Sequence, residues 1–106
     1  MKSNKLLCLV FPLLFGYCSS SNPIQTYGQL YQQQKDYESL KQVVDLMDLG
    51  VDTAQVKAIL GEPIDMGFDY RYLIDSVGPN GCVIGAVFHI DAAGRIDQKW
   101  IDEICE

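Results

Sequence analysis

Residues 50–63 have the sequence GVDTAQVKAILGEP, and this stretch decides the fold because it specifies a complete short helix with both of its ends. Asp52 is a good N-cap, since its side-chain oxygen can accept from the free amides of the first turn, and Gln55 follows at the spacing of a capping box. At the other end, Gly61 can adopt the left-handed C-cap conformation, and Pro63 prevents continuation of the helix. So short a helix is not stable alone in water, so it must pack against other elements.

The N-terminal residues have the pattern of a secretory signal peptide, predicted here as residues 1–17. Lys2 and Lys5 precede an apolar segment, residues 6–15, which small and polar residues follow. A membrane-spanning helix needs about 20 apolar residues, roughly twice the length of this segment. We therefore expect export of the chain and removal of the signal.

Cys18 follows the predicted signal directly and precedes a Ser-rich segment, which looks like a bacterial lipoprotein site where the cysteine receives the lipid. Lipid chains on Cys18 would anchor the protein to a membrane, because each buried CH₂ contributes about 0.8 kcal/mol. Tyr17 departs from the small residue that usually precedes such a cysteine. Cleavage of an ordinary secretory peptide near Ser21 is therefore the alternative.

The charge balance of the exported chain argues against a nucleic-acid partner. The full chain of 106 residues has 8 basic and 14 acidic residues, a formal net charge of −6. Loss of residues 1–17 removes two lysines, which leaves 6 basic residues against 14 acidic ones and a net charge near −8. Such a chain repels the phosphate backbone.

Beyond the signal, we expect a tether over residues 18–26 and one domain over residues 27–106. The tether is rich in serine and poor in apolar residues. From Tyr27, apolar residues recur at spacings of three and four, which predicts a helix that ends at Gly50 and is either continuous or broken near residues 35–37.

The remaining chain alternates with period two, which predicts strands. Residues 69–75 alternate apolar and polar side chains, and turn signals at residues 78–81 and 91–94 enclose a second strand over residues 82–90. Residues 95–105 suit a helix or a strand, and their position after a tight turn favours the strand. We expect an α+β fold in which two helices pack on one face of a three-stranded antiparallel meander (ααβββ).

Cys82 and Cys105 are expected to form the one disulfide of the mature chain, since export favours oxidation of the remaining pair. If Asp91 pairs with Arg95 in the last hairpin, Cys82 lies opposite Ile104, one residue from Cys105. A small register shift or bulge would bring the two sulfurs together. Closure of this loop would stabilise the fold by about 3 kcal/mol.

The sequence gives little indication of catalysis. The single histidine, His89, lies in the second predicted strand, where histidines are usually surface or edge residues. We find no nucleophile elbow, Cys-x-x-Cys pair or glycine-rich phosphate loop. We therefore expect no enzyme activity, no metal and no cofactor.

Four aromatic residues have two interpretations. They either pack in the core or form a surface for a partner, because aromatic rings are favoured both in strands and in interfaces. An exposed concave sheet face lined by Tyr70, Tyr72, Phe88 and Trp100 would favour an inhibitor that binds an enzyme, whereas a buried set would favour a scaffold protein. The candidate partner-surface residues are Phe68, Tyr70, Tyr72 and Trp100.

The spacing of Gly50, Asp52, Val56, Leu60-Gly61 and Pro63, followed by an aromatic strand, resembles the signature of the BamE/SmpA/OmlA family of outer-membrane lipoproteins. The resemblance covers roughly residues 46–97. It implies a two-helix, three-strand fold, also seen in the beta-lactamase inhibitor proteins.

The resemblance also implies a function, namely a periplasm-facing accessory subunit of the machinery that inserts β-barrel proteins into the outer membrane, working by binding partner lipoproteins and anionic lipid. The chain departs from the family at Asp69, where tryptophan is frequent, and at Asp52, which replaces threonine. We expect a non-enzymatic, lipid-anchored outer-membrane scaffold with envelope proteins as partners. The alternative is a secreted or tethered enzyme inhibitor.

Overall fold

The helix predicted from residues 50–63 forms as α3, Thr53–Leu60, in the computed structural model, which describes residues 22–106. Asp52 Oδ1 accepts from the Gln55 N–H, with 2.9 Å between the two atoms. Gly61 has a φ of +86°, and its N–H donates to the Lys57 carbonyl oxygen at 2.8 Å. These bonds satisfy backbone groups that the ends of a helix leave free.

Two helices precede α3: α1, Pro23–Gln34, and α2, Tyr37–Leu46. The chain breaks between them within the range that the sequence indicated. Lys35 has a left-handed φ of 53°, and the Asp36 side chain accepts from the Ser39 N–H at 3.0 Å as the N-cap of α2. Three helices therefore replace the two that the sequence predicted.

Helix α1 begins earlier than predicted. Residues 23–26, which we expected in the tether, form its first turn. Pro23 suits this position, because its φ is already helical and its missing N–H is not needed there. The Asn22 side chain accepts from the Ile24 N–H and completes the cap. The predicted signal peptide, Cys18 and the start of the tether lie outside the described residues.

The strands form one antiparallel sheet in sequence order, with one strand more than predicted. The additional strand, β1, has only two residues and pairs Ile64 with Arg71 and Asp65 with Tyr70. Residues 95–105 form mainly a strand, as the sequence favoured. The strands are β1, Ile64–Asp65; β2, Asp69–Val77; β3, Val83–Ile90; and β4, Ile96–Glu103.

A bulge near the start of β4 sets the register of the last hairpin. The Asp91 N–H donates to the Arg95 carbonyl oxygen at 2.8 Å, as the predicted pairing requires. The register then shifts by one residue between His89 and Ile90, so that Ile84 pairs with Glu103. This shift brings Cys82 and Cys105 together, and their sulfurs form a disulfide with 5.3 Å between the Cα atoms.

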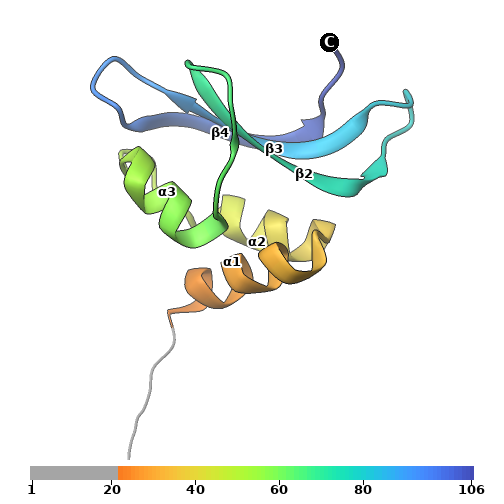
Figure 1. Ribbon diagram of the computed structural model, residues 1–106, viewed down its shortest axis with the longest axis horizontal. Coiled ribbons are helices and arrows are strands. Elements are labelled where there is room, and N and C mark those ends of the chain that lie inside the picture. The colour runs from red at the N-terminus through yellow and green to blue at the C-terminus, as the bar shows by residue number, and fades with distance from the viewer. Residues whose placement is uncertain (1–21) are drawn as a thin grey trace, which may run out of the picture.

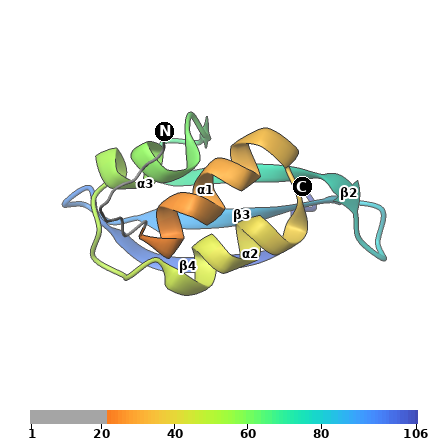
Figure 2. The same ribbon diagram turned by 90° about the horizontal axis from the view of Figure 1, so that it is seen from below.

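All three helices cover one face of the sheet, and the core lies between the two layers (Figure 1). Seen from the helix side, α1 lies between α2 and α3 (Figure 2). Tyr72 packs edge to face against Phe88, with 5.9 Å between ring centroids, and its hydroxyl donates to the Gly61 carbonyl oxygen. The core includes Leu40, Val43, Met47, Val56, Leu60, Tyr70, Tyr72, Ala86, Phe88 and Ile96.

Helices α1 to α3 are each too short or too polar to cross a membrane, and this finding concerns only residues 22–106.

Candidate functional site

The sheet has a second face, turned away from the helices, which we call the open face (Figure 1). Side chains alternate between the two faces along each strand, and paired residues share a face. Because Tyr70 and Tyr72 point to the core, Arg71 points to the open face. The row that continues from it across the strands is Ile64, Arg71, Val87 and Trp100.

An apolar groove of about 390 Å³ lies on the open face. Gly85 contributes to its shape because it has no side chain: a Cβ there would lie 2.8 Å from Leu73 Cδ2 and 3.1 Å from Ile104 Cδ1. These two side chains therefore close over the glycine. The groove is lined by Ile64, Met66, Arg71, Leu73, Val83, Ile104 and Glu106.

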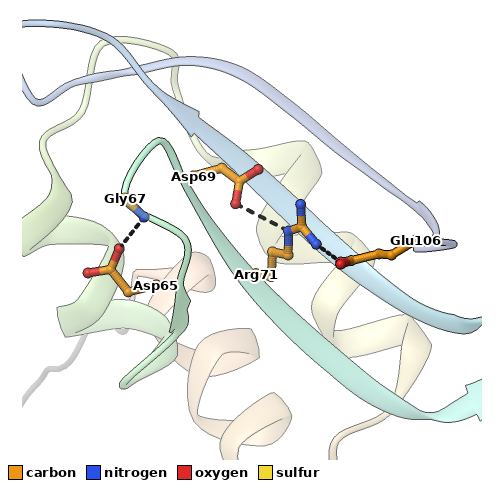
Figure 3. Close-up of polar contacts among 5 residues, drawn as sticks. All are labelled: Asp65, Gly67, Asp69, Arg71 and Glu106. Atoms are coloured by element: carbon orange, nitrogen blue, oxygen red, sulfur yellow. Dashed lines mark hydrogen bonds and ion pairs between the residues drawn. The ribbon is translucent and has the colours of Figure 1, made fainter.

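Three charged residues form a cluster at this groove (Figure 3). Arg71 Nε donates to Asp69 Oδ1 at 3.2 Å, and Arg71 Nη1 donates to Glu106 Oε2. The exposed fractions of these side chains differ: 7% for Asp69, 16% for Arg71 and 62% for Glu106. The hydrogen bond to Asp69 raises the pKa of Arg71, so the guanidinium keeps its charge.

Two hydrogen bonds and the disulfide hold the groove and the charged cluster in place. Asp65 Oδ1 accepts from the Gly67 N–H at 2.8 Å and fixes the turn that leads to Asp69 (Figure 3). On the other side, the Ile104 N–H donates to the Val83 carbonyl oxygen at 2.8 Å. The disulfide then fixes Cys105, which leaves Glu106 beside Arg71.

The structure divides the predicted partner surface between two faces and one strand end. Tyr70 and Tyr72 lie under the helices and are buried, so they cannot contact a partner. Phe68 is exposed just before β2, and its carbonyl oxygen accepts from the Ile90 N–H. Trp100 is exposed on the open face, opposite the tyrosines.

The other predicted positions have architectural contacts. Gly50 has a φ of +94°, and its N–H donates to the Ile96 carbonyl oxygen at 2.7 Å, which joins the connection between α2 and α3 to β4. Asp52, Gln55 and Gly61 form the caps of α3 described above. Pro63 is half-buried between α3 and β1. The residues of the 50–63 motif thus have structural roles.

Among the described residues, the single histidine and a cysteine–glutamate cluster are two further candidate sites, and each has partners in the structure. His89 Nδ1 lies 2.7 Å from Asp97 Oδ1, and both side chains are partly exposed. Cys82, Glu103 and Cys105 lie within reach of a single metal ion, but the two sulfurs are joined in the disulfide. Glu103 instead accepts from the backbone N–H of Asn80 and of Cys82.

Arg71 and the groove residues were not predicted from the sequence, although the sequence of β3 indicated an apolar surface on both faces of the sheet. This sequence, VIGAVFHI, is apolar at consecutive positions and so offers apolar side chains to both faces. Within residues 22–106, helices cover only one of those faces. Val83 and Val87 therefore have to be covered by other parts of the chain or by a partner.

The fold and site define a small α+β protein with one helix-covered sheet face and one open face. Comparison of the chain with protein-family models, curated proteins and solved structures gives no match.

Proposed function

We propose that the protein is a lipid-anchored, non-enzymatic accessory subunit of the complex that assembles proteins in the outer membrane, and that it contacts an envelope partner through the open face. The observation that carries this proposal is the apolar groove beside Arg71, on the sheet face that α1 to α3 leave uncovered. Exposed apolar surface of this kind is a common mark of protein–protein contact.

Burial of the tyrosines favours a scaffold over an inhibitor. The inhibitor interpretation required Tyr70, Tyr72, Phe88 and Trp100 together on an exposed sheet face. Three of these side chains are in the core, and only Trp100 is exposed. The open face instead presents the apolar groove and Trp100, which supports contact with a neighbouring subunit.

The sequence pattern around Cys18 supports the membrane location. Four peptide units separate Cys18 from Asn22, where the described structure begins, and they span at most about 14 Å. A lipid on Cys18 would therefore hold the domain beside the bilayer. The resemblance of residues 50–63 to the BamE/SmpA/OmlA signature supports the barrel-assembly complex as the partner.

Photo-crosslinking in intact cells tests the partner. We expect a photoreactive phenylalanine analogue at Trp100 to form crosslinks to barrel-assembly subunits. The same analogue at Gln33, exposed on α1 and remote from the open face, is the control and should give none. Equal crosslinking from both positions, or capture of a soluble enzyme from Trp100, would reject the scaffold proposal; the second result would support the inhibitor.

The anchor has a separate test. Intact mass spectrometry of the protein from the cell envelope should show acyl mass on Cys18. A mature chain without acyl mass, or one that begins after Ser21, would reject the anchor.

A further inference from the structure

Arg71 is placed to recognise a ligand as well as to stabilise the fold. It is the one cation among the residues that line the groove, and apolar side chains surround it. Its row neighbours on the adjacent strands are Ile64 and Val87. The Arg71 side chain is 16% exposed, and a charged donor beside apolar groups forms a stronger bond to a carboxylate than one in open water.

The two carboxylates on Arg71 differ in how firmly they are held. Asp69 is nearly buried and lies on the same strand, two residues before Arg71, where it fixes the orientation of the guanidinium through Nε. Glu106 is mostly exposed and follows the last residue fixed by the disulfide. An exposed carboxylate is screened by solvent and loses side-chain entropy when paired, so its bond to Arg71 can be exchanged.

The chain segment that lines one side of the groove indicates the pattern of a competing ligand. Ile104 and Glu106 are two residues apart and both line the groove. In an extended chain, residues two apart lie on the same side. Glu106 shows that a carboxylate reaches Arg71 from this side, and the apolar lining suits apolar side chains next to that carboxylate.

We propose that Arg71 binds a carboxylate of an extended segment of the partner protein, in which an acidic residue has apolar residues two positions away, and that this carboxylate displaces Glu106. The inference rests on the proposed function, since it names the chemistry of the partner at the same face. The chain has a formal net charge of −6, which does not attract an acidic segment at long range. Binding therefore depends on the contact with Arg71 itself.

A peptide-binding measurement tests this inference with the protein purified from the envelope under oxidising conditions. The probe is a fluorescent peptide with the sequence Leu-Ser-Glu-Ser-Ile and blocked ends, and the control peptide has glutamine in place of glutamate. We expect Arg71→Gln to weaken binding about tenfold or more. Arg95→Gln, which removes a guanidinium that binds the Gly50 carbonyl oxygen away from the groove, should leave the affinity unchanged.

Glu106→Gln separates recognition from stability. It removes the internal competitor, so the affinity should rise by roughly two- to fivefold, the range of an exposed ion pair. This measurement remains decisive if Arg71→Gln fails to fold. Unchanged or weaker binding by Glu106→Gln, equal binding of the glutamine peptide, or displacement of the probe by decanoate at equimolar concentration would each overturn the inference.

The result can be separated from that of the proposed function. Crosslinks from Trp100 to barrel-assembly subunits without peptide binding would retain the partner and reject carboxylate recognition. Peptide binding that follows Arg71, with no such crosslinks, would retain the recognition and reject that partner.

Discussion

Gly28 marks the closest approach between two helices, and its replacement by alanine should destabilise the fold. Gly28 is buried in α1, and a Cβ at this position would lie 2.3 Å from the Ile59 carbonyl oxygen and 2.8 Å from Ile59 Cγ2 in α3. One turn further along α1, Gln32 Nε2 donates to the same carbonyl oxygen at 3.0 Å. The new methyl group would push α1 and α3 apart and stretch this hydrogen bond.

Two opposing effects decide the size of the change. Alanine is favoured over glycine in a helix by about 1 kcal/mol. Overpacking of a tight core usually costs about 1–3 kcal/mol, and loss of the Gln32 hydrogen bond adds about 1 kcal/mol. Because the nearest atom is a backbone oxygen, which cannot rotate away, we expect overpacking to dominate. The net loss for Gly28→Ala should be about 1–3 kcal/mol.

Urea and thermal unfolding measure this loss. For a domain of this size, about 1 kcal/mol lowers Tm by roughly 4–8 °C. Gln33→Ala, at an exposed position of the same helix, is the control and should change the free energy of unfolding by no more than about 0.5 kcal/mol. Peptide binding at the open face should be unchanged in both variants. If Gly28→Ala were as stable as the native chain, the tight contact between α1 and α3 would be refuted.

Three further measurements test the core and the connections between its layers. Burial raises the pKa of Tyr31 to about 12 from an ordinary value of 10.0, so stability is complete below pH 10 and falls as pH rises towards 12. Tyr31 contributes a fall of about 1.4 kcal/mol per pH unit at most, and burial raises the pKa of Tyr72 in the same direction, so Tyr31→Phe should reduce the slope in urea titrations without removing it; parallel curves would contradict this. Replacement of Cys82 and Cys105 by serine should lower the free energy of unfolding by about 3 kcal/mol, and a loss below about 1 kcal/mol would argue against the disulfide's role. Lys99→Met removes a 2.5 Å hydrogen bond from Nζ to a backbone carbonyl oxygen near the end of α2 and should cost about 1 kcal/mol, whereas Lys41→Met, at an exposed ion pair, should cost less than half of that in the same assay.

The elements with local signals were predictable from the sequence. Helix α3 carries its own N-cap and C-cap, so its limits follow from residues within a few positions of each other. The chain break before α2 lies within residues 35–37, the range that the sequence indicated, and the structure shows Asp36 as the cap there. In contrast, β1 has only two residues and exists because β2 pairs with it. No local pattern specifies such a strand.

The face of each β4 residue was not predictable, because a bulge interrupts the alternation. Ile96 and Ile101 are five positions apart, an odd number, yet both pack against the core. The extra residue in the bulge makes this possible. Without it, Trp100 would be counted on the same side as Tyr72, as the sequence suggested. The bulge therefore places Trp100 on the opposite face from Tyr70 and Tyr72. It also brings Cys82 and Cys105 into register.

The same bulge allows the disulfide to position a residue of the open face. It aligns Cys105 with Cys82, and the disulfide then holds the tail so that Glu106 reaches Arg71. One covalent bond thus positions the carboxylate that a partner would have to displace. Serine at both Cys82 and Cys105 should therefore strengthen peptide binding, as Glu106→Gln does, because Glu106 competes less well for Arg71 when Cys105 is no longer fixed. Combining the two changes should then give little further gain, since both remove the same competitor. A full additive gain would show that the disulfide acts on the groove by another route.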